Sequence, residues 1–322
     1  MAIYTKISKG EIKYIEKKFN LGKIISFKGI KKGIENTNYL LRTKNRKFIL
    51  TIFEKRVQKK DLPFFMNLMD KLNSYKINCP KPQKNKIKKF LVNIKNKPTS
   101  IVSFVEGKDK FKLKIKECYE IGKNIAKLHR ASKKIKLYRK NSMSISCWSK
   151  LLKKIENRNK DVDVNLNDLM KKNLLEIKKK WPKNLPKGII HGDLFIDNIF
   201  FKNNKFYGYI DFYFACTDFL MYEIAICINA LCFDKIGRKF TFNKKKSKNL
   251  LKGYSRIRKF SKKEKNSLNI LCKGAALRYL LTRTYDYLNT PKSAIINKKD
   301  PKEYIQKLKI HNKLNNFKNY YN

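Results

Sequence analysis

Acidic side chains and long uncharged stretches are scarce in this sequence. Its 322 residues include 25 Asp and Glu against 78 Lys and Arg, which gives a formal net charge of +53. Because no run of about 18 uncharged apolar residues occurs, we expect no membrane-spanning helix and no membrane partner. Residues 1–19 alternate charged and apolar side chains, which argues against a secretory signal. A hydrophobic fraction of 42% nevertheless predicts a folded chain with a substantial core.

Paired cysteine motifs are also absent. The seven Cys residues are odd in number and form no CxxC pair, so the sequence lacks the spacing of a zinc site. An odd set without regular spacing fits reduced thiols better than a disulfide framework. We therefore expect a cytoplasmic protein whose cysteines are mostly small core residues.

The positive charge consists mainly of lysine. The chain has 67 Lys and 11 Arg, whereas proteins that bind phosphates or base edges often use the bidentate guanidinium group of Arg. Asn is frequent, at 33, and Ala is rare, at 9; Lys and Asn share A/T-rich codons. Mutational bias therefore explains the charge better than selected nucleic-acid binding, and we expect no specific nucleic-acid partner. Lysine is missing from residues 206–234 and 274–291, which indicates a constraint on these two segments.

The order of the predicted elements indicates an α+β protein with a β-rich lobe, residues 1–105, and a mostly helical lobe, residues 106–322. From residue 115 the apolar residues recur with the 3.6-residue period of helices, and one β-like segment interrupts them at 188–213. Asp61 is expected to cap a helix that has Pro63 in its first turn. The predicted elements are helices within 1–20, at 61–75 and at 115–129, strands at 22–29, 38–43, 47–53, 89–94 and 99–105, and a hairpin with its turn at Asn203 and Asn204.

The β-like segment contains the pattern H-G-D-x-x-x-x-N, formed by His191, Gly192, Asp193 and Asn198, and Asp211 ends the hairpin that follows. Phosphoryl transfer to an alcohol needs a carboxylate at the acceptor hydroxyl, and oxygen ligands for Mg²⁺ beside the nucleotide phosphates. We therefore predict Asp193 as the catalytic residue and Asn198 and Asp211 as magnesium ligands. The alternative for each is a role as a cap or turn residue. For His191, a hydrogen bond to the loop backbone is favoured over a chemical role.

The segments HGDLFIDN and IDFYFA resemble the aminoglycoside-phosphotransferase-like branch of the protein-kinase fold. Further segments, among them FKGIKKGIENTNY and LLTRTYDYLNTP, are similar to the bacterial homoserine kinase family of that branch, and the similarity covers nearly the whole chain. The resemblance implies a two-lobed protein-kinase-like fold, with a β-rich N-lobe for the nucleotide and a mostly helical C-lobe for catalysis and the acceptor. It also implies ATP-dependent phosphorylation of L-homoserine with Mg²⁺ as cofactor, a step of threonine biosynthesis.

The same resemblance assigns nucleotide-binding residues to the first lobe. The turn at residues 29–39 takes the place of the phosphate-covering loop, although it lacks GxGxxG. Thr51 stands where kinases of this fold commonly have a strand lysine, and Lys55 or Arg56 beyond the strand is expected to supply the charge. The predicted nucleotide contacts are Gly29, Gly33, Asn36, Asn38, Lys55, Ser103 and Val105.

Homoserine carries an ammonium group, a carboxylate and a primary hydroxyl, so its site needs an acidic and a basic group near the catalytic residue. The two lysine-free segments offer such groups. Because Arg283 and Asp286 are three residues apart on one helix face, an internal salt bridge is the alternative for this pair. For Asp218 and the nearby Glu223 a structural role is favoured. The predicted substrate contacts are Asp218, Tyr222, Arg283 and Asp286.

Two other functions are alternatives. A related small-molecule kinase that acts on choline, methylthioribose, an aminoglycoside or a sugar amine would carry the same three catalytic residues. A nucleic-acid-binding protein on a disused kinase scaffold would need a clustered basic face and would have lost the catalytic acids. The intact acids and the scattered lysines argue against the second alternative.

Overall fold

The computed structural model describes residues 3–31, 36–54, 57–290 and 299–321. The chain forms two compact units. Unit 1 comprises Met1–Gly107 and Tyr207–Tyr213, and unit 2 comprises Lys108–Phe206 and Phe214–Asn322. The sequence predicts a single lobe boundary at residue 105, whereas the units divide after Gly107 and residues 207–213 belong to unit 1.

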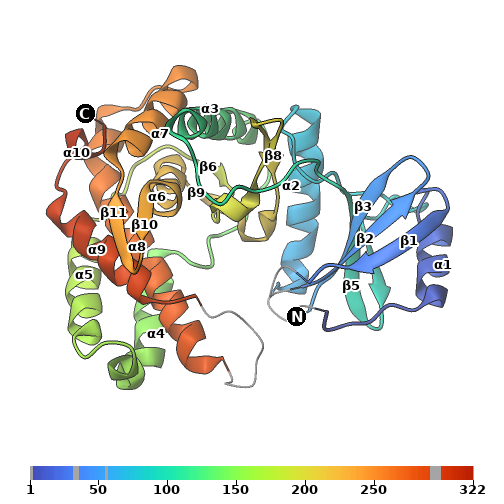
Figure 1. Cartoon of the computed structure of the whole chain (residues 1–322), viewed down its shortest axis with the longest axis horizontal. Coiled ribbons are helices and arrows are strands. Elements are labelled where there is room, and N and C mark those ends of the chain that lie inside the picture. Colours follow the sequence, from blue (N-terminus) through green and yellow to red (C-terminus); the bar gives the residue numbers. More distant parts are fainter. Residues whose placement is uncertain (1–2, 32–35, 55–56, 291–298, 322) are drawn as a thin grey trace. The chain divides into compact units, whose positions relative to one another are not determined.

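Unit 1 is built on a five-stranded antiparallel sheet with the strand order β1-β2-β3-β5-β4 (Figure 1). The turn between β4 and β5 consists of Lys95 and Asn96, and both have the positive φ that tight hairpin turns require. The strands are β1 (Ile24–Gly29), β2 (Thr37–Thr43), β3 (Lys47–Ile52), β4 (Leu91–Ile94) and β5 (Lys97–Ser103), and the helices are α1 (Lys9–Lys18) and α2 (Leu62–Ser74).

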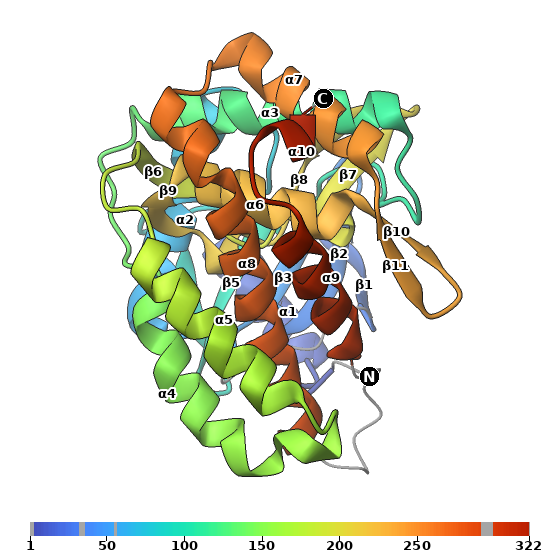
Figure 2. The same ribbon diagram turned by 90° about the vertical axis from the view of Figure 1, so that its left-hand side faces the viewer.

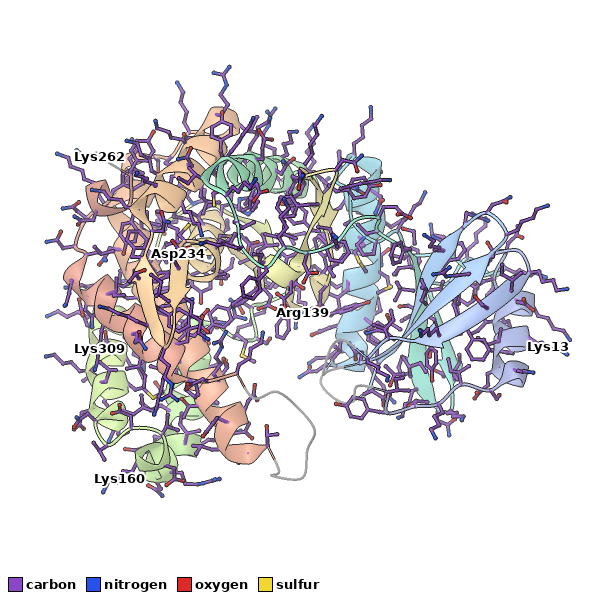
Figure 3. The ribbon with its side chains drawn as sticks, in the orientation of Figure 1. Lys13, Arg139, Lys160, Asp234, Lys262 and Lys309 are labelled. Carbon is purple, nitrogen blue, oxygen red and sulfur yellow. The ribbon has the colours of Figure 1, made fainter. Side chains whose placement is uncertain are left out.

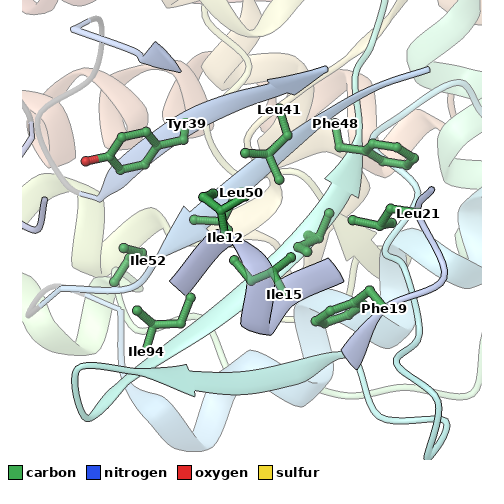
Figure 4. Packing of buried hydrophobic residues seen from close by; sticks show 11 residues of the cluster. Ile12, Ile15, Phe19, Leu21, Tyr39, Leu41, Phe48, Leu50, Ile52 and Ile94 are labelled. Atoms are coloured by element: carbon green, nitrogen blue, oxygen red, sulfur yellow. The ribbon is translucent and has the colours of Figure 1, made fainter. Parts of the chain in front are cut away.

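The core of unit 1 lies between this sheet and α1 (Figure 4). Ile12 and Ile15 on the buried side of α1, and Phe19 beyond its end, are in one cluster with alternate strand residues such as Leu41 and Leu50. Each buried side chain of this size contributes about 1.5–3 kcal/mol relative to an exposed one. The cluster explains the apolar period within residues 1–20 and confirms the helix predicted there.

The start of α2 departs from the sequence prediction. Asp61 occupies the N-cap position, but its side chain makes no capping hydrogen bond to the helix. Its backbone is already helical, at φ −89° and ψ −16°, because a short 3-10 turn at Lys59–Asp61 (η1) precedes the helix. A capping residue normally needs an extended backbone to turn its side chain toward the first turn. The predicted capping role of Asp61 is therefore wrong, whereas Pro63 lies in the first turn as expected.

Unit 2 is mostly helical and is organised around two helices, α6 and α8. Nearly every residue of α6 is buried, and so is most of α8 between residues 268 and 284. Helices α4, α5 and α9 pack against α8, which runs lengthwise beside α5 and α9 (Figure 2). The helices are α3 (Ile115–Ser132), α4 (Ile145–Ile155), α5 (Leu166–Lys180), α6 (Leu220–Leu231), α7 (Lys244–Ile257), α8 (Lys262–Asn289), α9 (Lys302–Lys313) and α10 (Lys318–Tyr321).

Two glycines allow α3 and α7 to approach each other closely. A Cβ atom at Gly122 of α3 would lie 2.0 Å from the carbonyl oxygen of Leu250, and one at Gly253 of α7 would lie 1.9 Å from that of Tyr119. Both obstacles are backbone atoms, which a side-chain rotation cannot move aside. The contact between these helices therefore depends on glycine at both positions.

Short strands complete unit 2. β6 (Lys187–Ile190) and β9 (Cys216–Phe219) pair in antiparallel fashion, and β7 (Ile199–Lys202) pairs with β8 (Lys205–Tyr209), which leads into unit 1. The turn residues Asn203 and Asn204 both have positive φ, which confirms the predicted hairpin. The prediction that the rest of this lobe is helical missed β9 and the hairpin of β10 (Phe233–Ile236) and β11 (Lys239–Phe242).

The lysines follow the burial of these elements. Exposed lysines such as Lys13, Lys262 and Lys309 point outward from their own units (Figure 3). The lysine-free residues 206–234 and 274–291 include α6 and residues 274–284 of α8, which are nearly all buried and where an unpaired charge would be costly. Three buried lysines of unit 2 each pair with an acid, Lys246 with Asp234, Lys273 with Glu176 and Lys307 with Glu303.

In the described ranges no helix has the length and apolarity needed to cross a membrane.

Candidate active site

Strand β6 leads into the loop that carries His191, Gly192 and Asp193. Gly192 has a φ of +78°, and a Cβ atom there would lie 2.8 Å from the carbonyl oxygen of Phe214. Both the backbone conformation and the lack of space require glycine. The loop therefore packs directly against the backbone that leads into β9.

Glu223 of α6 anchors this loop. Its buried carboxylate accepts hydrogen bonds from the backbone N–H groups of His191 and Gly192, the latter at 3.1 Å. Nε2 of His129 on α3 lies 4.0 Å from the same carboxylate, and Nδ1 of that ring is 2.8 Å from the hydroxyl oxygen of Tyr254. Burial lowers the pKa of His129, although Glu223 opposes the shift. These contacts give Glu223 the structural role that the sequence favoured.

Asp193 is half-buried and is held at both its side chain and its backbone. The hydroxyl group of Tyr279 on α8 donates to Oδ1 of Asp193 at 3.1 Å. The backbone oxygen of Asp193 accepts hydrogen bonds from Nδ2 of Asn198 at 2.8 Å and from the N–H group of Phe195 at 2.9 Å. Among the described residues Oδ2 of Asp193 has no hydrogen-bond partner, so this oxygen can meet an acceptor hydroxyl.

Asn198 ends a 3-10 turn at Ile196–Asn198 (η3) and is buried. Its Nδ2 atom is engaged with the backbone of Asp193, so the amide oxygen is the atom that can face a metal ion. Amide and carboxylate oxygens are the hard ligands that Mg²⁺ prefers. The donor chemistry of Asn198 therefore fits its predicted role.

Asp211 belongs to unit 1 and is exposed. Its φ of +63° lies in the left-handed region, which Asp adopts more readily than most residues. Just after it, the ring of Tyr213 packs edge-on against Phe53 and Phe65, with centroid distances of 5.1 and 5.7 Å. These contacts fix the backbone that follows Asp211. In the part of the chain that the structure describes, no group of three His, Cys, Asp or Glu side chains could hold a metal ion.

Two of the predicted phosphate-covering residues are held by the end of β3. Oδ1 of Asn38 accepts a hydrogen bond from the Thr51 hydroxyl at 2.8 Å, and Oδ1 of Asn36 accepts one from the backbone N–H group of Glu54 at 3.3 Å. At the place of the strand lysine, unit 1 thus has an uncharged hydroxyl that is engaged with Asn38. The predicted contact Gly29 ends β1, whereas Gly33, Lys55 and Arg56 lie outside the described residues.

Glu54, whose backbone contacts Asn36, also links the start of β2 to the N-terminal segment and to β5 through its carboxylate. Its carboxylate accepts hydrogen bonds from the hydroxyls of Thr5 and Thr37, at 2.7 Å each, and pairs with the ammonium group of Lys97. Burial alone would raise the pKa of Glu54, but Lys97 and the two hydroxyls lower it overall. The charge of Lys97 is therefore matched by Glu54 and is not left for a phosphate group.

Two of the predicted nucleotide contacts, Ser103 and Val105, lie where β5 ends. The Ser103 hydroxyl oxygen accepts a hydrogen bond from the backbone N–H group of Lys81 at 2.9 Å, and Val105 is buried. A pocket of about 760 Å³ within unit 1 is lined by Ser103, Phe104, Arg42 and other residues at this end of the sheet. Of the two predicted contacts, Ser103 lines this pocket and Val105 does not.

Two of the predicted substrate contacts lie on β9 and α6. Oδ2 of Asp218 accepts a hydrogen bond from Nδ2 of Asn141 at 2.6 Å, and Oδ1 accepts one from the backbone of Phe219 at 2.7 Å. Burial raises the pKa of Asp218, and these hydrogen bonds oppose the shift. Tyr222 is buried, and its ring meets Trp181 edge-on at 5.6 Å. Asp218 thus already has two partners within unit 2.

Arg283, the predicted basic group, pairs with Glu303 of α9 and not with its neighbour Asp286. Nη1 of Arg283 lies 2.5 Å from Oε2 of Glu303, and the guanidinium group stacks over the ring of Tyr304 at 4.5 Å. Glu303 also pairs with Lys307, at 2.6 Å. Asp286 lies one turn further along α8 and is exposed. The ion pair thus joins two helices, where the sequence suggested a pair within one helix.

The residue that sequence reasoning missed is Tyr279. It neighbours Arg278, whose Nη1 atom donates to the backbone oxygen of Gly192 at 2.8 Å. Both residues lie in the second lysine-free segment, which also contains the predicted substrate contacts Arg283 and Asp286. The absence of lysine points to this segment, but it does not show that Tyr279 contacts Asp193.

Comparisons with known proteins identify the family of this chain. The profile of the APH phosphotransferase enzyme family matches residues 26–240. A homoserine kinase from Agrobacterium fabrum is 42% identical over 320 residues, which cover 99% of this chain and 98% of that protein. A homoserine kinase from Paramagnetospirillum magneticum is 41% identical and covers 97% and 96% of the two chains.

Solved structures show the same fold at low identity. The amicoumacin kinase hAmiN, in complex with AMP-PNP, Ca²⁺ and Ami, matches with a TM-score of 0.72 at 11% identity and covers 96% of this chain and 95% of that one. The choline kinase LicA from Streptococcus pneumoniae matches with a TM-score of 0.61 at 16% identity, over 95% and 98% of the two chains. The predicted two-lobed, protein-kinase-like α+β fold is confirmed. The chain belongs to the phosphotransferase enzyme family.

Proposed function

We propose that this chain is a kinase that transfers the γ-phosphoryl group of ATP to the hydroxyl of L-homoserine, in the cytoplasm and as a step of threonine biosynthesis. The observation that carries the proposal is the similarity to curated homoserine kinases over nearly the full length of both chains. The anchored loop around Asp193 supports it, since catalysis of phosphoryl transfer consists mostly of positioning and electrostatic stabilisation.

Asp193 is the catalytic residue in this proposal. Its Oδ2 atom orients the homoserine hydroxyl and accepts the proton as the new P–O bond forms and the bond to ADP breaks. Glu223 holds the backbone just before Asp193 and Asn198 holds the backbone oxygen of Asp193 itself, which limits the freedom of this residue before the substrate arrives. A reacting group that is positioned in advance loses less entropy in the transition state.

Asn198 and Asp211 are proposed as the magnesium ligands. This assignment rests on the sequence pattern and on the oxygen atoms that both side chains can offer to a metal ion. The ion, when bound, neutralises charge on the phosphates of ATP. For the nucleotide we propose contacts from the turn at residues 29–38 and from the end of β5. The residues so assigned are Gly29, Gly33, Asn36, Asn38, Lys55, Ser103 and Val105.

Asp218, Tyr222, Arg283 and Asp286 are proposed as contacts of the acceptor. Arg283 is the candidate partner of the homoserine carboxylate, because a guanidinium group binds a carboxylate with two parallel hydrogen bonds. Its ion pair with Glu303 holds the guanidinium group in place and also competes for it. Asp218 is the candidate partner of the ammonium group.

A panel of acceptors with ATP and Mg²⁺ tests the proposal. We expect kcat/KM to be highest for L-homoserine, with choline, methylthioribose, an aminoglycoside and a sugar amine as competitors in the same assay. A clear preference for one of these acceptors would overturn the assignment to homoserine while keeping the reaction class.

A salt titration with duplex DNA and RNA tests the remaining alternative, a nucleic-acid-binding protein, and absence of binding at physiological salt would exclude it.

A further inference from the structure

We propose that Tyr279 is a positioning residue of the phosphoryl transfer, which holds Oδ1 of Asp193 so that Oδ2 faces the acceptor hydroxyl. The inference rests on the proposed function, because it takes Asp193 as the catalytic residue. It assigns a role to a side chain of α8 that lies 86 residues from Asp193 in the chain.

The hydrogen bonds around the Tyr279 hydroxyl direct its single proton toward Asp193. Nη1 of Arg278 lies 3.2 Å from the hydroxyl oxygen of Tyr279, and as a guanidinium group it can only donate. The tyrosine proton is therefore available to Oδ1 of Asp193 at 3.1 Å or to the backbone oxygen of Gly192 at 3.4 Å. The closer and more negatively charged acceptor is the carboxylate, and hydrogen bonds to ionised groups are the stronger ones.

The ring of Tyr279 is itself held firmly. It is 7% exposed, meets the ring of Phe195 edge-on at 5.0 Å, and packs against Tyr304 at 5.3 Å and under the guanidinium group of Arg278 at 4.5 Å. Burial raises the pKa of Tyr279 well above its usual value, although Arg278 opposes the shift. A raised pKa keeps the hydroxyl protonated near neutral pH, so that it can donate to Asp193.

Arg278 ties this contact to the loop. The same Nη1 atom that donates to Tyr279 donates to the backbone oxygen of Gly192 at 2.8 Å. One cation thus holds both the backbone before Asp193 and the side chain that contacts its carboxylate. Within the described residues the protein engages only Oδ1 of this carboxylate, which leaves Oδ2 to accept the proton of the substrate hydroxyl.

The test compares Tyr279→Phe with Tyr304→Phe. Each variant removes one buried hydroxyl and keeps the ring, and the hydroxyl of Tyr304 has no hydrogen-bond partner among the described residues. We expect Tyr279→Phe to lower kcat by roughly 10- to 100-fold, the loss expected for a hydrogen bond to a charged group, with KM for ATP and acceptor unchanged. We expect Tyr304→Phe to keep the kcat of the wild type. A kcat of Tyr279→Phe equal to that of the wild type would overturn the inference.

A double-mutant cycle separates positioning from a general structural role. If Tyr279 acts through Asp193, then Tyr279→Phe should cause no further loss of kcat in the Asp193→Asn background. An equal loss in both backgrounds, or a fall in thermal stability that accounts for the loss, would show a structural role and contradict the inference. The assay uses the acceptor that the panel identifies. Failure with homoserine therefore overturns the proposed function, while the two tyrosine variants still decide the role of Tyr279.

Discussion

The carboxylate of Glu223, on the buried helix α6, accepts a hydrogen bond at 3.1 Å from the backbone N–H group of Gly192, the residue before Asp193. The same carboxylate also accepts a hydrogen bond from the backbone N–H group of His191. The position of the catalytic loop is therefore set by a charged side chain of the core. A loop that is anchored in this way can present Asp193 without help from the substrate.

Replacing Glu223 should affect both folding and catalysis. Glu223→Gln keeps the size of the side chain but replaces a charged acceptor by an amide, so we expect the free energy of unfolding to fall by about 2 kcal/mol. We also expect kcat to fall, because the loop loses its anchor. Urea unfolding and steady-state kinetics measure the two effects. Glu120→Gln, at a partly exposed ion pair with Lys123 one turn along α3, is the control that should change neither.

The contact of α3 with α7 gives a prediction on stability alone. In Gly253→Ala the new methyl group would lie 1.9 Å from a backbone oxygen of Tyr119, so the helices must move apart, at a cost of about 1–3 kcal/mol. Gly10→Ala in α1 is the matched control. There the nearest atom is 3.7 Å away, and alanine should leave stability unchanged or raise it by up to about 1 kcal/mol. Equal melting temperatures for the two variants would contradict the close approach.

The nucleotide site should depend on a cation beyond β3. Thr51 supplies no charge at the usual place of the strand lysine, and Lys97 is matched by Glu54. We therefore expect Lys55→Ala or Arg56→Ala to raise KM for ATP with little change in KM for homoserine. Lys59→Ala, at the exposed turn before α2, is the control. If neither Lys55→Ala nor Arg56→Ala changes KM for ATP, the assignment is wrong.

The pair of Arg283 and Glu303 predicts a dependence of stability on pH. Burial would raise the pKa of Glu303, but Lys307 and Arg283 lower it overall from its usual value of 4.5. A lowered pKa in the folded state means that the ionised carboxylate stabilises the fold above pH 4.5 and that this contribution is lost as the pH falls further. Glu303→Gln should therefore be less stable than the wild type at pH 7. The difference in unfolding free energy should shrink below pH 4.5, and a difference independent of pH would contradict this account.

Local features of this chain could be predicted from the sequence. The hairpin at Asn203 and Asn204 follows from turn chemistry that needs no knowledge of the fold, and the helix at the start of unit 1 follows from its apolar period. The pattern around Asp193 and Asn198 was found because its residues are close in sequence. The four-residue strand β9 was missed because its pairing with β6 is not local.

Contacts between distant segments could not be predicted. The two lysine-free segments indicate a constraint, and burial of α6 and of residues 268–284 of α8 accounts for only part of it, since Asp211 and Asp286 in the same segments are exposed. Arg283 finds its acid on α9, and Asp193 meets Tyr279 across 86 residues. Neither partner could be chosen without the packing of α8 against its neighbours.

The most direct test of the central claim is the product that the wild-type chain and Asp193→Asn form from ATP and L-homoserine, followed by ³¹P NMR. We expect the wild type to form the phosphate monoester of homoserine. We expect Asp193→Asn to lower kcat by about 10²–10⁴-fold, the usual contribution of a general base, with modest changes in KM. Absence of the monoester with the wild type, or near-normal kcat in Asp193→Asn, would contradict the account.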